Sequence, residues 1–294
     1  PGTDNVFTRQ GVLIEWQDTK PTNSTFEGTA RELLRVEFNN RFHPIGDLLF
    51  NPLATGPAHP DWRRLYVAVG EGGAGEMNNA ILHATPQRLD VLQGKILRIV
   101  PDAPAGGPLR YTIPADNPFL DAVAGAGIRP EIYAYGFRNP HRLTFDPPTG
   151  LLLETDVGFH TWEEVNIIRR GANYGYADRE GTAVLDVATG IASGPLPADD
   201  APKGYTYPVI QYAHSPALGV GDAICGGFVY RGTKLPQLQG KFIFGDITTG
   251  ELFYADLAAM IAADDGNPST RASYHSIDIE LTNPRSTGVA CAAL

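Results

Sequence analysis

The sequence predicts an all-β fold built from many short strands and tight turns. Its 33 glycines and 24 prolines are spread through 294 residues, which favours frequent turns over long helices. Hydrophobic residues make up 43% of the chain and charged residues 19%, enough apolar material for a large core. A pattern also recurs: LLFNP followed by LYVAVG returns as LTFDP followed by LLLETDVG. The phenylalanines Phe50 and Phe145 lie about 95 residues apart, which equals two blades of a β-propeller at ~40–50 residues per four-stranded blade.

The first half of the chain contains strand-length apolar runs separated by Gly- or Pro-rich turns. The predicted strands are residues 11–16, 31–38, a strand within 42–52, 63–73 and 94–102. Residues 80–94 are expected to form a helical turn that breaks at Pro86, because proline lacks the amide hydrogen that continues a helix.

The second half continues the same pattern. Residues 131–136, 142–147 and 151–158 are predicted strands, and residues 226–257 hold three more. Residues 182–204 carry few charges and many turn-forming residues, and they are predicted to form a long loop or lid. After Leu257 the chain becomes rich in Ala and Asp, so we expect residues 258–294 to form an irregular tail.

Charge and composition exclude some classes of partner. The net charge of −10 and the isoelectric point near 5.1 argue against nucleic acid or an anionic membrane surface, since both need a basic face. No apolar run reaches the ~18 residues of a membrane span, and no signal peptide opens the chain. Cys225 and Cys291 form either one disulfide or two buried thiols, and the sequence leaves both open. A small neutral ligand or a cation is the expected partner.

Residues 129–181 concentrate the polar groups that a ligand site needs. Arg138 and Asn139 directly follow a predicted strand, where a cation and an amide can face a ligand. Oxygen-bearing residues come next, in a composition that suits a hard cation such as calcium: Glu163, Glu164, Asn166 and Glu180. Singly, an Arg-Asn-Pro turn is usually a strand-end cap and an acidic loop is usually solvated. Their concentration in one stretch favours a site.

This stretch resembles the glucose/sorbosone dehydrogenase family. The matching segments are RPEIYAYGFRNPHRLTFDP, the DVG that follows, and EEVNIIRRGANYGY…REG, in this order. The family consists of soluble quinoprotein sugar dehydrogenases that bind pyrroloquinoline quinone (PQQ) and calcium on a six-bladed β-propeller. The resemblance implies one propeller domain over residues 1–294, with four-stranded antiparallel blades. We expect the ring to be incomplete at both ends of the chain.

The resemblance also implies a catalytic histidine. In the family the base lies in an H-x-x-G-x-L pattern, and His43, Gly46 and Leu48 occupy the three fixed positions. Asp47 stands where better-known sugar dehydrogenases carry a basic residue, which bears on the choice of substrate. Glu71 replaces an aspartate that supports the histidine. Without the resemblance, a histidine at a strand start is more often a polar cap.

Cofactor contacts follow from the same resemblance. Arg138 and Asn139 would bind PQQ, with Lys234 as a weaker candidate that is equally well explained as a solvated turn lysine. The carbonyls of Gly158 and Phe159 would hold the calcium that polarises the quinone. A second, structural calcium would use Glu164 with the carbonyls of Tyr174 and Glu180, and a turn cap explains Glu164 equally well. The family's C-terminal arginines have no match in residues 258–294.

Two functions follow as hypotheses. The first is a PQQ-dependent dehydrogenase in which His43 removes the proton of the anomeric hydroxyl of an aldose while hydride passes to the quinone and then to an external acceptor. Such a protein is expected to be periplasmic or secreted, as in the family. The second is a non-catalytic propeller that binds protein or glycan, as in hedgehog-interacting-type proteins. The match of His43 favours the first hypothesis, and the unmatched arginines favour the second.

Overall fold

The computed structural model describes residues 9–74, 80–102, 110–120, 127–215, 221–280 and 290–291. Strands dominate this part of the chain, which confirms the predicted all-β class. They are β1 (Arg9–Asp18), β2 (Gly28–Phe38), β3 (Ile45–Phe50), β4 (Leu65–Val69), β5 (Lys95–Ile99), β6 (Ile132–Tyr135), β7 (Pro140–Asp146), β8 (Leu151–Asp156), β9 (Trp162–Ile167), β10 (Arg179–Glu180), β11 (Ala183–Asp186), β12 (Ile191–Ser193), β13 (Ile210–Ala213), β14 (Ile224–Val229), β15 (Lys241–Asp246), β16 (Leu252–Asp256), β17 (Tyr274–Ile277), β18 (Ile279–Glu280) and β19 (Ala290–Cys291).

The helical elements are short. They are α2 (Ala80–His83), α3 (Leu257–Ala263) and the 3-10 turns η1 (Thr85–Gln87), η2 (Ala201–Lys203) and η4 (Pro236–Leu238). The helical turn expected in residues 80–94 is present, but α2 already ends at His83 and Pro86 lies inside the first turn of η1, where proline is tolerated. In the described ranges, no helix is long and apolar enough to cross a membrane.

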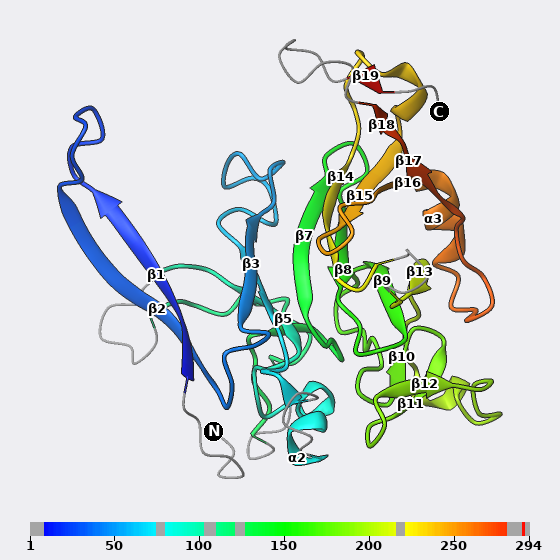
Figure 1. Cartoon of the computed structure of the whole chain (residues 1–294). Helices are drawn as coiled ribbons and strands as arrows, with labels where there is room; N and C mark the ends of the chain where they lie inside the picture. Colours follow the sequence, from blue (N-terminus) through cyan, green and yellow to red (C-terminus); the bar gives the residue numbers. More distant parts are fainter. Residues whose placement is uncertain are drawn as a thin grey trace.

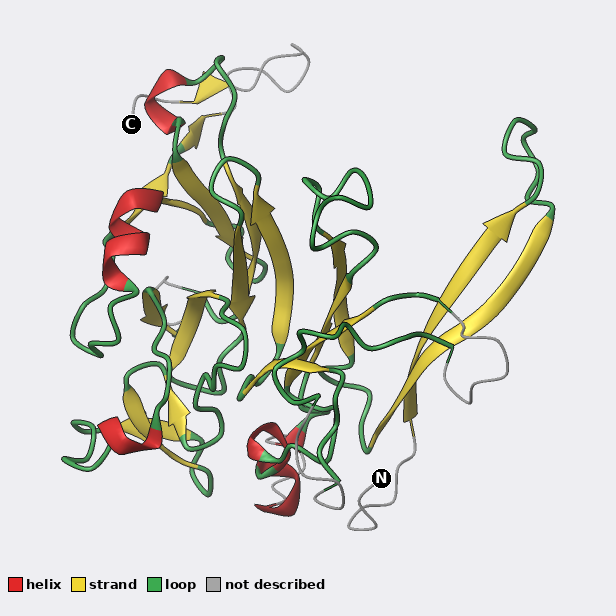
Figure 2. Cartoon of the chain, turned by 180° about the vertical axis from the view of Figure 1, so that it is seen from behind, coloured by secondary structure: helices red, strands yellow, loops and turns green. Residues whose placement is uncertain are grey.

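Three four-stranded antiparallel sheets form the body of the molecule (Figures 1 and 2). The first sheet has the order β3-β4-β5-β6, the second β13-β9-β8-β7 and the third β14-β15-β16-β17. A small sheet, β10-β11-β12, is inserted in the second sheet between β9 and β13, and β1-β2 and β18-β19 are two-stranded. This arrangement is consistent with propeller blades, while six as the number of blades stays a prediction.

The three sheets meet along their first strands, β3, β7 and β14. Arg142 on β7 donates from Nη1 to the carbonyl of Gly46 on β3, at 2.9 Å. Asp47 Oδ2 accepts the Leu143 N–H at 2.9 Å, so the aspartate that replaces a basic residue joins β3 to β7. On the other side, a Cβ on Gly226 of β14 would lie 2.6 Å from the Arg142 side chain. The first residues of β3, β7 and β14 therefore lie at the same end of the three sheets. We call this end the entry face.

Separate apolar cores fill the spaces between these layers. The core between the second and third sheets includes Leu153, Val165, Ile210, Phe244 and Phe253. The core between the first and second sheets includes Tyr66, Ile96, Phe137, Leu143 and Leu152. Because Leu152 and Leu153 are neighbours on β8 and belong to different cores, both faces of the second sheet are buried, as in a stack of blades.

The β1–β2 ribbon extends from the first sheet at the left of Figure 1. Its Leu34, Val36 and Phe38 are buried in the core that also contains Leu65 and Val67 of the first sheet. This contact anchors the base of the ribbon on the body.

Two expectations for irregular segments were wrong. Residues 182–204, expected as a loop or lid, contain β11 and β12, whose Ala183, Leu185 and Ala192 pack with Phe159 and Tyr176. These strands are only four and three residues long, too short to give a periodic signal.

The tail beyond residue 257 is also ordered in part. α3 begins after Asp256, whose Oδ1 accepts the N–H groups of Ala258 and Ala259 at 2.9 and 3.2 Å, and β17 completes the third sheet. Ala-rich composition suits a capped helix, because alanine has the highest helix propensity. Residues 281–289 and 292–294 of this expected tail lie outside the described residues. On β14, Cys225 is a half-buried free thiol.

Lys95 supplies a test of the first sheet's stability. Its fully buried Nζ donates to the carbonyls of Thr85, Pro86 and Gln93 at 2.9, 2.9 and 2.7 Å. We expect Lys95→Met to lower the free energy of unfolding by about 2–4 kcal/mol, because three buried carbonyls lose their donor. Urea unfolding measures the change, with Lys241→Met at the more exposed Asp256 ion pair as control. Equal effects of the two substitutions would contradict this role.

Candidate active site

His43 and Glu71 form a hydrogen-bonded pair at the entry face. The distance from His43 Nδ1 to Glu71 Oε1 is 2.5 Å. The Glu71 side chain is fully buried, while the His43 side chain is 12% exposed. The bond orients the imidazole, with Nε2 on the side of the ring that faces away from Glu71. The two residues predicted to act together are therefore in contact.

Backbone groups hold Glu71 in place. Its carboxylate accepts N–H groups of Gly73, at 2.8 Å, and Ala74. Burial by itself favours the neutral carboxyl, but hydrogen bonding to His43, the charges of His43 and Arg138 and the Ala74 N–H together hold the pKa of Glu71 below its usual value. Glu71 is thus an anionic partner for the histidine.

The backbone at His43 is tightly packed. His43 has φ of +47°, a left-handed conformation that non-glycine residues adopt rarely. A Cβ on the neighbouring Gly70 would lie 2.5 Å from the His43 carbonyl oxygen and 2.7 Å from its Cβ. Glycine at position 70 therefore permits the close approach that brings His43 to Glu71.

Asp156, at the end of β8, fixes the start of β7. Its two carboxylate oxygens accept the N–H groups of Arg138 and Asn139 at 3.0 and 2.6 Å. The Arg138 carbonyl in turn accepts the Glu71 N–H at 2.8 Å. These bonds place the predicted cofactor-binding residues directly beside the His43–Glu71 pair. Asp156 belongs to the DVG segment, but its side chain was not predicted as part of the site.

The Arg138 guanidinium lies on the segment that was predicted to hold calcium. Its Nη1 donates to the carbonyls of Gly158 and Val157 at 2.6 and 3.2 Å, and it lies over the Phe159 ring at 5.1 Å. The predicted quinone-binding cation and the predicted calcium ligands Gly158 and Phe159 are therefore in direct contact.

Glu180 holds the same segment through its side chain. Its Oε1 accepts four successive N–H groups, those of Phe159, His160, Thr161 and Trp162, at 2.7 to 3.1 Å. Its Oε2 is buried without a hydrogen-bond partner among the described residues. The sequence drew attention to the Glu180 carbonyl, whereas in the structure its carboxylate organises the loop.

A ladder of buried acids lies on the face of the second sheet that meets the first. Asp156 pairs across the strands with Glu164, and Glu154 pairs with Asn166. Burial, and then the charges of these acids on one another, raises the pKa of Glu154 well above its usual value and that of Glu164 to about 8. Burial likewise raises the pKa of Asp156 to about 7. These carboxyls need either protons or a bound cation.

The other predicted calcium and cofactor residues are less closely grouped. Glu164 Oε1 accepts the N–H of Gly181, the residue that follows Glu180. Tyr174 is buried against Phe137, with its hydroxyl bound to the Ile167 carbonyl. In the described part of the chain, no group of three or more His, Cys, Asp or Glu side chains is arranged to hold a metal ion.

Lys234 lies away from the other predicted residues. It is exposed in the turn that follows the end of β14, next to Arg231, which binds Asp146 at the end of β7. This is the opposite end of the inner strands from the entry face. The sequence could not show this position of Lys234, because β14 runs from the entry face to the opposite end of the sheet before the chain reaches Lys234.

Tyr176 contributes a buried hydroxyl beside Arg138. Burial raises the pKa of Tyr176 well above its usual value; the charge of Arg138 opposes this rise, and Glu71, Glu180 and Asp156 add to it. The hydroxyl has no hydrogen-bond partner among the described residues. This hydroxyl was not among the polar groups of the site that were predicted from the sequence.

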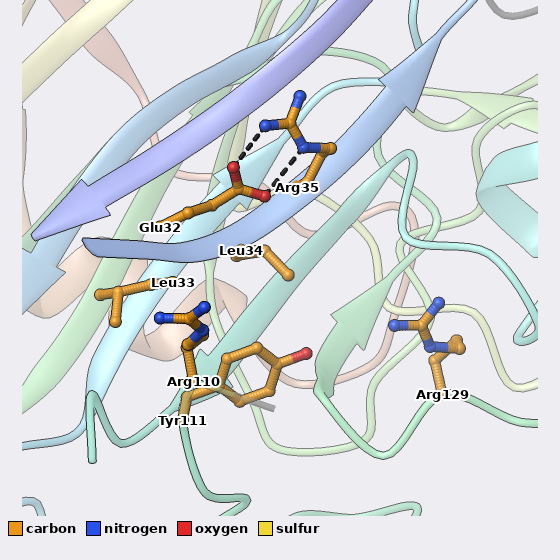
Figure 3. Close-up of a pocket in the computed structure, with 7 residues that line it drawn as sticks. All are labelled: Glu32, Leu33, Leu34, Arg35, Arg110, Tyr111 and Arg129. Atoms are coloured by element: carbon orange, nitrogen blue, oxygen red, sulfur yellow. Dashed lines mark hydrogen bonds and ion pairs between the residues drawn. The ribbon is translucent and has the colours of Figure 1, made fainter. Parts of the chain in front are cut away.

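A surface pocket of about 430 Å³ lies elsewhere, between β2 and the first sheet (Figure 3). Its lining residues are Glu32, Leu33, Leu34, Arg35, Arg110, Tyr111 and Arg129. Arg35 is paired with Glu32, and Arg129 with Glu131. None of the predicted site residues lines it.

Comparison with known proteins identifies the family. The profile of the family described as Glucose / Sorbosone dehydrogenase matches residues 53–270. The chain belongs to this family. Glu71, Arg138, Asn139 and the segment from Gly158 to Glu180 lie in the matched range, and His43 precedes it.

Relatives in the family carry different names. The chain is 31% identical to the HIPL1 protein of Arabidopsis thaliana over 79% of its own length and 31% of that protein. It is 32% identical to quinoprotein glucose dehydrogenase B of Acinetobacter calcoaceticus, over 86% of the chain and 50% of that protein. It is 26% identical to human hedgehog-interacting protein, over 74% of the chain and 25% of that protein. The chain thus spans half or less of these relatives.

A solved structure shares the fold. The PQQ-bound form of aldose sugar dehydrogenase from Streptomyces coelicolor matches with a TM-score of 0.55 and 22% identity, covering 90% of the chain and 57% of that structure. At this identity the likeness concerns the fold alone.

The Glu180 carboxylate can be tested by substitution. We expect Glu180→Ala to lower the free energy of unfolding by about 2–4 kcal/mol, because four N–H groups lose their acceptor. Glu180→Gln keeps one carbonyl oxygen and should cost about half as much. Urea unfolding and amide hydrogen exchange at residues 159–162 measure the effects. Unchanged exchange in the alanine variant would contradict the role of this carboxylate.

The acid ladder predicts a stability that falls as pH rises. A carboxyl whose pKa is raised by folding favours the folded state at low pH and loses that advantage from about pH 4.5 upward. In buffer with a chelator, we expect Glu154→Gln to be more stable than the wild type at pH 8 by at least ~1 kcal/mol, with little difference at pH 4.5. Thermal unfolding across this range measures it, with the exposed Glu251→Gln as control. A parallel pH dependence in wild type and variant would refute the assignment.

Proposed function

We propose that this protein is a PQQ- and calcium-dependent dehydrogenase that oxidises the anomeric hydroxyl of aldose sugars. The observation that carries the proposal is the His43–Glu71 pair, joined through the backbone to Arg138 at the entry face. Family membership and the quinoprotein relative support the same reaction class.

His43 is the proposed base. Its Nδ1 is engaged by the Glu71 carboxylate, so Nε2 is the nitrogen that would take the proton of the sugar hydroxyl. Glu71, anionic and buried, stabilises the imidazolium that forms. Glu71 is therefore a positioning residue, since it acts through His43.

The residues beside His43 fit a planar anionic cofactor and a cation. Among the residues that the structure describes, neither the buried Tyr176 hydroxyl nor the buried Glu180 Oε2 has a hydrogen-bond partner, and Tyr176 lies near Arg138. Arg138 and Asn139 would hold the carboxylates of PQQ, and the Gly158 and Phe159 carbonyls would hold calcium once Arg138 Nη1 releases the Gly158 carbonyl, which it binds at 2.6 Å. When bound, the quinone accepts hydride from the sugar carbon. Glu164, with the carbonyls of Tyr174 and Glu180, is the proposed second calcium site.

Lys234 is not needed in this proposal, because it lies at the opposite end of β14. The electron acceptor is proposed to be external to the chain. A periplasmic or secreted location is proposed from the family, in which the substrate sugar is met outside the cytoplasm.

A second candidate function is a binding module for protein or glycan. It is favoured by the likeness to hedgehog-interacting protein and by the Arg138 guanidinium, which is already bound to the Val157 and Gly158 carbonyls at the predicted quinone site. In this alternative the entry face would bind its partner without redox chemistry.

Titration of the calcium-loaded protein with PQQ separates the two candidates. We expect a change in the PQQ absorbance on binding, followed by bleaching when an aldose is added. His43→Ala should slow the bleaching at least ~100-fold while PQQ still binds, because only the proton acceptor is removed. His275→Ala, an exposed histidine on β17, is the matched control. Absence of PQQ binding by folded wild-type protein would reject the dehydrogenase and favour the binding module.

A further inference from the structure

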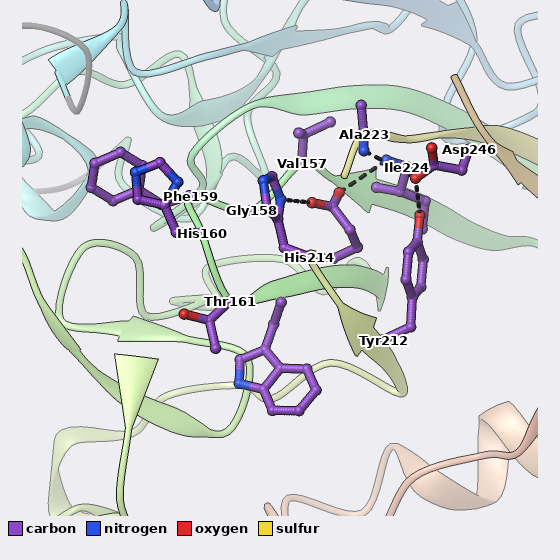
Figure 4. A network of polar contacts seen from close by, with 12 residues as sticks. Val157, Gly158, Phe159, His160, Thr161, Tyr212, His214, Ala223, Ile224 and Asp246 are labelled. Atoms are coloured by element: carbon purple, nitrogen blue, oxygen red, sulfur yellow. Dashed lines mark hydrogen bonds and ion pairs between the residues drawn. The ribbon is translucent and has the colours of Figure 1, made fainter. Parts of the chain in front are cut away.

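A second histidine–glutamate pair lies at the entry face (Figure 4). His214 Nδ1 is 2.5 Å from Glu163 Oε1, and Glu163 Oε2 accepts the Ile224 N–H at 2.9 Å. The Glu163 side chain is fully buried and that of His214 is 17% exposed. This arrangement closely parallels the His43–Glu71 pair. His214 was not among the predicted site residues, and Glu163 was named only as part of the oxygen-rich stretch.

Its position is set by the start of β14. His214 follows β13, and the next residue, Ser215, donates its N–H to the Gly221 carbonyl at 2.7 Å. Ile224, which Glu163 binds, is the first residue of β14. His214 therefore lies where the third inner strand begins, just as His43 precedes β3 and Arg138 precedes β7.

A continuous row of contacts joins His214 to the site. The backbone N–H of His214 donates to the Thr161 carbonyl at 2.9 Å. The His214 ring meets the His160 ring edge-on, with 6.1 Å between the ring centroids. His160 stacks on Phe159 at 4.2 Å, and Arg138 lies over Phe159. The segment 157–161 thus has Arg138 on one side and His214 on the other. Since Glu180 binds four N–H groups of 159–162, this separation is rigidly kept.

The buried carboxylate determines which nitrogen of His214 can meet a ligand. Both oxygens of Glu163 are used inside the protein, so Nδ1 faces inward and Nε2 lies on the outward side of the ring. A neutral imidazole held in this way accepts a hydrogen bond at Nε2, and a protonated one donates there. Either form suits a hydroxyl group, which is both donor and acceptor.

We propose that His214, positioned by Glu163, is a carbohydrate-binding residue whose Nε2 hydrogen-bonds a sugar hydroxyl at the entry face. The proposal rests on the proposed function for its substrate class, an aldose, and adds a binding contact across the 157–161 segment from Arg138. His160 is exposed and stacks on the buried ring of Phe159, so the imidazole of His160 is the aromatic surface available to the apolar face of a pyranose.

The test is a comparison of sugars that differ by one hydroxyl. Binding of D-glucose, other common aldoses and disaccharides is measured by calorimetry, and for the tightest sugar each monodeoxy analogue is then titrated. We expect His214→Ala to weaken binding of the parent sugar about tenfold and to leave one deoxy analogue unaffected, because that analogue lacks the contacted hydroxyl. Glu163→Gln, which keeps the shape of the carboxyl, should show the same pattern with a smaller loss.

Controls separate this proposal from folding defects and from the proposed function. His275→Ala should bind all sugars as the wild type does, and His214→Gln replaces the alanine variant if that one unfolds. In turnover, a contact residue raises KM more than it lowers kcat. Equal losses for parent and all deoxy analogues, or no sugar bound by the wild type, would overturn the proposal. If PQQ does not bind, the dehydrogenase is rejected, while sugar titration still decides the role of His214.

Discussion

The carboxylate of Asp156 is the interaction on which the candidate site depends. By accepting the N–H groups of Arg138 and Asn139, it sets the direction in which β7 leaves the loop. That direction brings the Arg138 carbonyl to Glu71 and its guanidinium to Gly158. These two hydrogen bonds of Asp156 therefore hold the His43–Glu71 pair, the Arg138 side chain and the Gly158 segment in fixed positions relative to one another.

The burial of the Asp156 carboxylate near other acids also has an electrostatic cost. Asp156, Glu154 and Glu164 are buried close together, and their raised pKa values express the cost of keeping several negative charges out of water. A protein that needed only stability would be better served by apolar side chains here. These three carboxyls therefore require protons or a bound cation to offset their mutual repulsion.

Strand alternation distributes these groups. Glu163 and Glu164 are consecutive on β9, so their side chains point to opposite faces of the second sheet. Glu164 joins the acid ladder toward the first sheet, while Glu163 binds His214 and the start of β14 toward the third. One dipeptide thus serves two adjacent interfaces, and the site is shared by all three sheets.

By itself the sequence determined the elements and much of the chemistry. Apolar runs between Gly and Pro located most strands of the three sheets, but not β9, β13 or β17. The linear segments around His43, Arg138 and Gly158 indicated the family, because these features are local in the chain. Short strands such as β11 and β12 were not predicted, since three or four residues are too few to show a hydrophobic period. Tertiary structure alone decided which ends of the strands meet. It placed Lys234 at the opposite end from Arg138, joined His214 to Glu163 across about fifty residues, and used the Glu180 side chain as a loop anchor. These outcomes depend on the alignment of β3, β7 and β14, and no single segment of the chain records that alignment.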